Sequence, residues 1–425
     1  MENVTDLTQL IIEDIIPSRI NKTSLQYFLK KADPNNKYSH NANKLSLVYD
    51  FFDNCADAKN KFSGFIIKNL MYGKSRVITE SDIASIPQPI TNKEKLLNQL
   101  GIPENELNFN NIMDFNPSNK FKEVYRNVVL DEGDGAKDEI KHIDIIFARK
   151  YLDPSSESQK LRGEYVWVEI DFDAFKVWLH MSSRHNNQVD RELPSQPILL
   201  FNYFKSVLHN SYGLMITENS EEDFIFKLYS YLTKKDEEKY LEKVNKEEDG
   251  IEELCDNILE NLDIEDDDNE VLERVKGVFL RKIIQNDFNN FTNNPDVEGR
   301  VKAFIFSDPE GTRLQASKGP GRSLIGDEIN IESSTAYFDN KETINKAQKL
   351  FSVLIVWTPG YDDISNFLQV RYTAYPGFLE THFLYSDITE DEYKNVLQKI
   401  RRIRKNNEEW SDCSWCNSKI RYMAD

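Results

Sequence analysis

The segment from Val166 to Met181 constrains the fold more than any other part of this sequence. If Asp173 and Ala174 form a turn, alternate residues on the two arms are apolar and face one another. The resulting pairs are Phe172 with Phe175, Ile170 with Val177, Val168 with Leu179 and Val166 with Met181. A slip of one residue would mix apolar and polar side chains on both faces. The segment therefore predicts an antiparallel hairpin with this register.

The rest of the chain divides into strand-like and helix-like patterns. Strand periodicity marks residues 121–130 and 140–152, which an acidic turn at 131–135 joins, and then 301–306, 352–357, 368–375 and 378–385. Helical periodicity marks 7–15, 24–32, 45–54, 59–71, 92–100, 197–212 and 390–405. This order predicts an α+β fold with a helical N-terminal unit and antiparallel, hairpin-rich central and C-terminal parts.

Four units are expected along the chain. Residues 1–117 form a helical N-terminal unit, and residues 118–215 form a β-hairpin-rich unit with a helix. Residues 216–295 form an acidic helical insertion. Residues 296–425 form a C-terminal α+β unit that could share a sheet with 118–215.

Charge is concentrated in the predicted insertion. Residues 218–270 carry 21 acidic and 6 basic side chains, a net charge of −15 out of −19 for the whole chain. Because such a charge density leaves few helix faces to bury, we expect this segment to project from the body and to add little to the core. The remaining chain is nearly neutral and has room for local basic patches.

Composition narrows the class of protein. With 39% apolar residues in 425, the chain has enough material for a folded core. The N-terminal segment is acidic, unlike a secretory signal, and the longest apolar run is too short to cross a bilayer. Four cysteines do not make a disulfide scaffold in a chain of this length. We therefore expect a soluble, cytoplasmic protein without a membrane contact.

The polar face of the predicted hairpin is the first candidate site. It collects Glu169, Asp171 and His180, and Asp144 lies on the preceding strand. Carboxylates on one sheet face can bind a divalent cation in a metal-dependent nuclease. These enzymes commonly place a Lys two residues after an acidic residue, and Asp171 lacks one there. The pattern favours a polar sheet surface with Asp171 paired to Lys176, and the nuclease remains the alternative.

The second candidate site is a glycine-rich segment, residues 311–326, which carries Arg313, Lys318 and Arg322 and no acidic residue before Gly326. Glycines let backbone amides approach an anion closely, and the cations attract phosphate. The glycine and lysine spacing fits neither a phosphate-binding loop of nucleotide hydrolases nor a dinucleotide fingerprint.

The third candidate site is the basic C-terminal helix with Arg401, Arg402 and Arg404. Such cations also complement the dipole of their own helix. Cys413 and Cys416 follow, but a single CxxC pair supplies only half of a zinc site, so we expect neither a metal nor a cofactor.

These observations favour a non-enzymatic binding component of a cytosolic assembly. The acidic insertion would bind a protein partner, and the basic residues would contact nucleic acid. The Asn-, Lys- and Ile-rich composition without a housekeeping motif suggests a role in bacterial antiviral defence. The first alternative is a nuclease that uses Asp144, Glu169 and Asp171, and the second is a scaffold that binds protein only.

Overall fold

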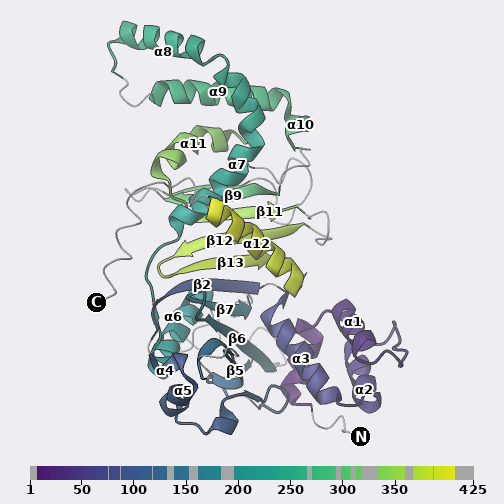
Figure 1. Ribbon diagram of the computed structural model, residues 1–425. Coiled ribbons are helices and arrows are strands. Elements are labelled where there is room, and N and C mark those ends of the chain that lie inside the picture. Colours follow the sequence, from purple (N-terminus) through teal and green to yellow (C-terminus); the bar gives the residue numbers. More distant parts are fainter. Residues whose placement is uncertain are drawn as a thin grey trace. The chain divides into compact units, whose positions relative to one another are not determined.

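The structure is a computed structural model (Figure 1). It describes residues 7–74, 76–86, 88–116, 118–131, 138–152, 161–182, 196–265, 270–292, 298–307, 313–317, 331, 334–358, 367–385 and 387–406. The chain forms two compact units. Unit 1 comprises Met1–Ser220 and Tyr375–Glu390, and unit 2 comprises Glu221–Ala374 and Asp391–Asp425. Both combine helices with antiparallel strands, which confirms the predicted α+β class.

Unit 1 contains a helical layer and a sheet. Its helices are the π-helix Ile11–Arg19, α1 Lys22–Ala32, α2 Lys44–Asn54, α3 Ala58–Met71, α4 Gln88–Thr91, α5 Lys93–Leu100, the 3-10 helix Glu104–Glu106, α6 Pro197–Val207 and the π-helix Leu208–Tyr212. Its strands are β1 Gly73–Lys74, β2 Arg76–Ser85, β3 Phe109–Asn110, β4 Lys122–Leu130, β5 Ile140–Leu152, β6 Leu161–Asp171, β7 Lys176–Ser182, β8 Met215–Ile216, β13 Phe378–Leu384 and β14 Asp387–Ile388.

The helix ends follow the local sequence. Asn21, Asn43 and Asn92 each accept a hydrogen bond from a backbone N–H in the first turn of the helix that follows. Gly101 ends α5 with a φ of 66°, in the left-handed conformation that glycine adopts without strain. Pro17 does not end the first helix as its position suggests, because the helix is of the π type and continues to Arg19.

The sheet of unit 1 runs in the order β13, β2, β7, β6, β5, β4, β3, and every neighbouring pair is antiparallel. The predicted hairpin register is confirmed, since Ile170 pairs with Val177 and Val168 with Leu179. The ladder ends at Asp171 and Lys176, so Phe172 and Phe175 lie in the turn rather than in a pair. The expected helical N-terminal unit also contributes β2, a strand with neighbours on both sides.

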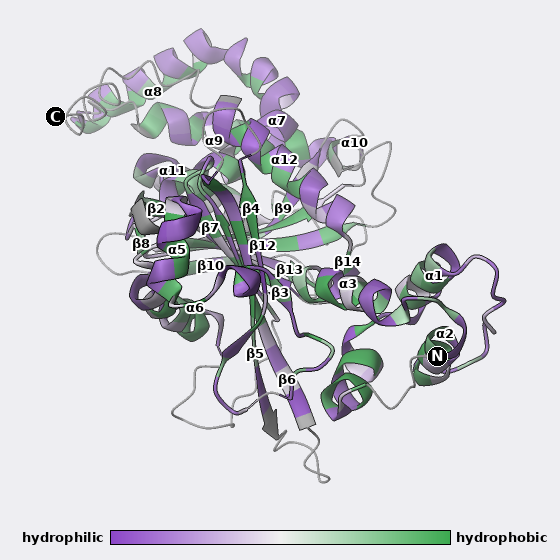
Figure 2. Ribbon diagram, turned by 60° about the horizontal axis from the view of Figure 1, so that its bottom comes forward, coloured by the Kyte–Doolittle hydropathy of each residue, from purple (hydrophilic) through white to green (hydrophobic). Residues whose placement is uncertain are grey.

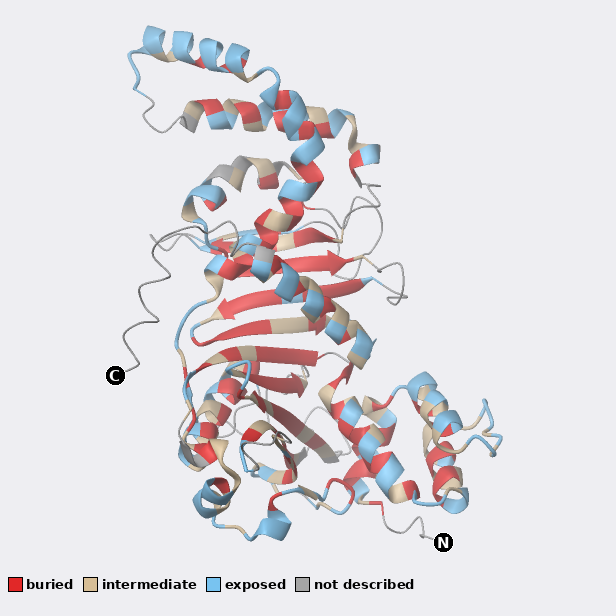
Figure 3. Cartoon of the chain, viewed as in Figure 1, coloured by how far each residue is buried: buried red, intermediate tan, exposed pale blue. Residues whose placement is uncertain are grey.

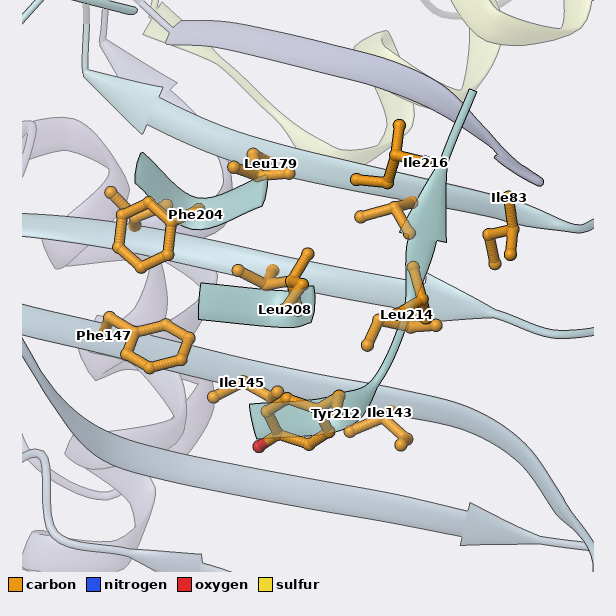
Figure 4. Close-up of a cluster of buried hydrophobic side chains, with 14 of the residues drawn as sticks. Ile83, Ile143, Ile145, Phe147, Leu179, Phe204, Leu208, Tyr212, Leu214 and Ile216 are labelled. Carbon is orange, nitrogen blue, oxygen red and sulfur yellow. The ribbon is translucent and has the colours of Figure 1, made fainter. Parts of the chain in front are cut away.

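The two faces of this sheet are covered by different helices. On one face, apolar residues of β5, β6 and β7 pack beneath α6 and the π-helix that follows it, as Figure 4 shows for Ile145, Phe204 and Leu208. On the other face, Ile146, Trp167 and their neighbours pack with the N-terminal helices. Because side chains alternate along a strand, the predicted register places each apolar set against its own helical layer.

Unit 2 has four strands and six helices among its described residues. Its helices are α7 Glu222–Asn245, α8 Glu248–Leu262, α9 Glu270–Asn286, α10 Phe288–Thr292, α11 Thr335–Ala347 and α12 Glu390–Asn406. Its strands are β9 Gly299–Ser307, β10 Arg313–Ser317, β11 Ser352–Trp357 and β12 Leu368–Tyr375, in the spatial order β10, β9, β11, β12. All six residues of β11 are buried, which agrees with the uninterrupted apolar run that follows Ser352.

The prediction that residues 218–270 add little to the core is wrong for α7. This helix packs on β9 and β11, and it buries Ile225, Leu228, Tyr229 and Tyr240. Two of its carboxylates are buried as well, because each meets a partner distant in sequence. Asp236 pairs with Arg300 at 3.2 Å, and Glu237 pairs with Lys341 on α11.

The prediction fits α8 better. In unit 2, α8 and α9 lie at the end away from the strands, and α8 is almost entirely exposed (Figures 1 and 3). Only Ile251 and Cys255 of α8 are buried. Within the part of the chain that the structure describes, no helix is both long and apolar enough to span a membrane.

Candidate functional site

Four polar residues of the central strands form a cluster on one face of the unit 1 sheet. Asp144 on β5 lies opposite Glu169 on β6, and His142 lies one pleat away on the same face. His180 on β7 lies opposite Trp167, the residue that precedes Glu169 by two positions. We call His142, Asp144, Glu169 and His180 the carboxylate–histidine cluster. The sequence predicted three of its members and missed His142, although its spacing of two from Asp144 places both on one strand face.

Each carboxylate of the cluster has partners within the protein. The Asp144 Oδ1 accepts a hydrogen bond from the Trp167 indole at 3.1 Å and lies 3.1 Å from His142 Nε2. The Glu169 carboxylate lies 3.4 Å from His180 Nε2 and 3.9 Å from His142 Nε2. His180 is completely buried, and its Nδ1 lies 3.2 Å from the backbone oxygen of Met71. The cluster is therefore held in place by contacts among its own side chains and with Trp167 and Met71.

The carboxylates also change the proton affinity of their neighbours. Burial by itself would lower the pKa of His142, but the hydrogen bond to Asp144 and the charges of Asp144 and Glu169 raise that pKa above its ordinary value. Burial, then Glu390 and then Glu169 raise the pKa of Tyr72. The two carboxylates thus favour the protonated form of His142.

Asp171 has a different role from the other predicted catalytic residues. Its Oδ1 accepts a hydrogen bond from the backbone N–H of Ala174 at 2.8 Å, so the carboxylate caps the hairpin turn. Lys176, directly opposite Asp171, bonds to Glu80 at 2.5 Å and to Asp82 at 2.8 Å on β2.

Among the residues that the structure describes, no group of three His, Cys, Asp or Glu side chains could hold a metal ion.

The cations of the glycine-rich segment are only partly placed. Arg313 is exposed on β10, and its guanidinium lies 5.6 Å from the ring centre of Phe351. Lys318 and Arg322 lie outside the described residues, as do Cys413 and Cys416 at the C-terminal end.

The cations of α12 differ in their surroundings. Arg401 is exposed, whereas Arg402 pairs with Glu298. Arg404 pairs with Glu221 at 3.2 Å and lies 4.1 Å from the ring centre of Phe224. Two of the three predicted phosphate-binding arginines therefore already face carboxylates, which reduces the positive potential of this helix.

The predicted sites did not include an apolar surface on α8. Leu254, Ile258 and Leu262 are 51%, 49% and 61% exposed. Their spacing of four places them along one side of the helix, and we call them the α8 stripe. This regular spacing was available in the sequence, but the surrounding charge concealed it. Single exposed apolar residues are ordinary on protein surfaces, whereas an aligned row of them is typical of a binding surface.

Neither a protein-family model nor a curated protein matches this chain, so the function has to be inferred from its own residues and geometry.

Proposed function

We propose that this protein is a non-enzymatic binding component that docks on a protein partner through the α8 stripe. The observation that carries the proposal is the exposure of Leu254, Ile258 and Leu262 on a helix that buries only two residues. Because each of these side chains is already about half buried, covering it with a partner would contribute roughly 0.8–1.5 kcal/mol, half of the value for a fully exposed Leu or Ile. An i, i+4, i+8 row is the arrangement that an amphipathic helix uses in a partner's groove.

The stripe lies outside the buried apolar cluster of the unit 2 helices. These helices build that cluster from Tyr240, Val244, Ile251, Cys255, Leu272, Leu280, Ile284 and Phe291. The stripe residues are absent from that cluster. Their exposed apolar surface is in contact with water, which is unfavourable in free energy. A binding function accounts for keeping them apolar.

The test is affinity capture from lysate of the native host, with and without nuclease treatment. One bait is the native chain, and a second carries Leu254→Gln, Ile258→Gln and Leu262→Gln. A third bait carries Tyr27→Gln, Leu199→Gln and Met215→Gln, which changes equally exposed apolar residues in unit 1. We expect one set of proteins to be lost with the stripe bait alone and to be retained after nuclease treatment. Equal capture by all three baits would contradict the proposal.

Contact with nucleic acid is a second, weaker proposal. It is supported by the exposure of Arg313 and Arg401 and by the local excess of Lys and Arg around Lys318 and Arg322. The ion pairs of Arg402 and Arg404 count against it. The same capture experiment separates the two, because a partner held through nucleic acid disappears when nuclease is added.

A further inference from the structure

We infer that the segment that docks on α8 is a basic, amphipathic stretch of the partner protein, with a Lys or Arg side chain that enters a hollow where α8 meets α9. The inference rests on the proposed function and adds the chemistry of the partner. It follows from the shape, the charge and the unpaired carboxylates of α8.

The apolar part of α8 is wider than its neighbour covers. At about 100° per residue, the side chains of Ile251, Leu254, Cys255, Ile258, Leu259 and Leu262 span an arc of about 140°. Ile251 and Cys255 are buried in the cluster with α9, whereas Leu254, Ile258 and Leu262 are exposed. Hydrophilic and hydrophobic residues alternate along this helix, as Figure 2 shows. The uncovered part of the arc is a surface on which apolar side chains of a partner can pack.

A hollow lies on the other side of the α8–α9 seam. Its volume is about 340 Å³, and its lining consists of Glu252, Cys255, Asp256, Leu259, Glu260, Ile264 and Leu272. Glu252, Asp256 and Glu260 are spaced by four, so they form a carboxylate ladder along one wall. Cys255, Leu259 and Leu272 contribute apolar surface. A Lys or Arg side chain has the matching chemistry, since its aliphatic stem packs on apolar atoms while its head meets carboxylates.

The charge of this helix is not neutralised from within. No Lys or Arg occurs from Glu247 to Glu265, a stretch that contains nine Asp and Glu residues. Glu248 pairs with Lys276 of α9. Among the described residues, Glu252, Asp256 and Glu260 form no ion pair, so their charge is available to a ligand.

The same charge excludes other occupants. A second copy of this chain would bring an identical acidic helix against the first, and like charges at close range repel. Nucleic acid and anionic lipid are excluded for the same reason. A basic protein segment with an apolar face satisfies both the stripe and the hollow, which is why we assign the site to that class of partner.

The test uses a fluorescently labelled 18-residue helical peptide of Leu and Lys, and a second peptide in which each Lys is replaced by Glu. Binding is measured by fluorescence anisotropy with the full-length protein. We expect the Lys peptide to bind and the Glu peptide not to bind. Neutralising the ladder with Glu252→Gln, Asp256→Asn and Glu260→Gln should weaken Lys-peptide binding about tenfold and flatten its salt dependence.

The matched control carries Asp53→Asn, Glu94→Gln and Asp391→Asn, which removes the same charge at exposed positions elsewhere. It should leave peptide binding unchanged. Reversing the ladder with Glu252→Lys, Asp256→Lys and Glu260→Lys should create binding of the Glu peptide, a gain that a misfolded protein cannot produce.

The outcomes distinguish the inference from the proposed function. If the stripe variant loses its captured partner while the ladder variants bind both peptides as the native protein does, the docking function stands and the basic partner is wrong. If the stripe variant retains every captured protein, the docking function itself is wrong. Equal binding of the Lys and Glu peptides to the native protein would also overturn the inference.

Discussion

Asp14 is a fully buried carboxylate that joins the first helix to β6. It accepts hydrogen bonds from Ser18 at 2.6 Å, Arg19 at 2.9 Å, Arg162 at 3.0 Å and the backbone N–H of Gly163 at 3.1 Å. Burial by itself would raise its pKa, but Arg19 and the hydrogen bonds lower the pKa from 3.8 to about 2. Because each bond favours the ionised form, the charge of Asp14 stabilises the folded state.

We expect Asp14→Asn to lower the free energy of unfolding by about 3 kcal/mol, since it removes a buried counter-charge from the partly buried Arg19 and Arg162. Urea denaturation measures this, with the exposed Asp53→Asn as the control. The folded-state pKa lies below the unfolded one, so the contribution is present above pH 3.8 and is lost as the pH falls toward 2. A stability difference between native and variant protein that persists unchanged at pH 2 would contradict this role.

Phe175 is an aromatic residue in a conformation that favours glycine. Its φ is 54° at the hairpin turn, and its side chain is 57% exposed. Because little burial is lost, we expect Phe175→Gly to raise the free energy of unfolding by about 0.5–1 kcal/mol. Phe175→Ala removes the same ring but keeps the strained φ, so it should bring no gain. Thermal unfolding of both variants is the measurement. A gain in stability for Phe175→Gly alone indicates relief of backbone strain, whereas an equal gain for both variants indicates an effect of removing the ring.

His142 reports on the carboxylate–histidine cluster. Its pKa is raised in the folded protein, so its protonation stabilises the fold fully below the unfolded pKa of about 6.5, and this contribution is lost as the pH rises through the folded value. NMR titration of the ring should give a pKa above 6.5. Asp144→Asn should lower it by removing the hydrogen-bonded charge. A pKa for His142 that is the same in both proteins would show that Asp144 is not its main partner.

At the scale of elements, α7 and α8 each carry six acidic residues but have different roles, and only α7 also carries lysines, five of them. Charge density predicted that both would be exposed, yet α7 lies on the strands of unit 2 and α8 lies mainly in solvent. The difference arises because buried charges are tolerated when each has a partner, as Asp236 has in Arg300. No local pattern announces a partner 64 positions away in the sequence.

Two leucines test this contrast. Leu228 of α7 is fully buried and Leu254 of α8 is half exposed. We expect Leu228→Ala to lower the free energy of unfolding by about 2–5 kcal/mol because it opens a cavity. Leu254→Ala should change it by less than about 0.5 kcal/mol. Chemical denaturation of the two variants is the measurement, and equal losses would mean that α8 is as much a part of the core as α7.

At the scale of the whole molecule, the uneven charge governs association with polyanions. The segment 218–270 repels phosphate, while the rest of the chain is nearly neutral. If the chain binds nucleic acid, we expect the triple variant Arg313→Ala, Lys318→Ala and Arg322→Ala to lower the affinity equally for unrelated sequences. The slope of log affinity against log salt concentration should become shallower by roughly one for each phosphate contact that is lost. Filter binding at low salt checks this, and an affinity that depends on base sequence would argue against simple phosphate attraction.

Part of the candidate site could be predicted from the sequence. The hairpin register places Glu169 and His180 on one face, and the structure confirms that face, places the predicted Asp144 opposite Glu169 and adds His142. The register could be predicted because only one alignment separates apolar from polar residues. The hydrogen bond from the Ala174 N–H to Asp171 could not be predicted, because it depends on the side-chain rotamer of Asp171 and on the conformation of the hairpin turn.

Periodicities of two and 3.6 residues are local in the chain, so they were enough to predict the α+β class, the order of most strands and helices, and the central hairpin. They could not predict which acidic helix is buried and which keeps an exposed apolar stripe. Burial of an acidic helix depends on partners that folding brings together, such as Lys341 for Glu237. An exposed apolar stripe is recognised only when the neighbouring helix is in place, because only then is it known which part of the apolar arc that neighbour covers.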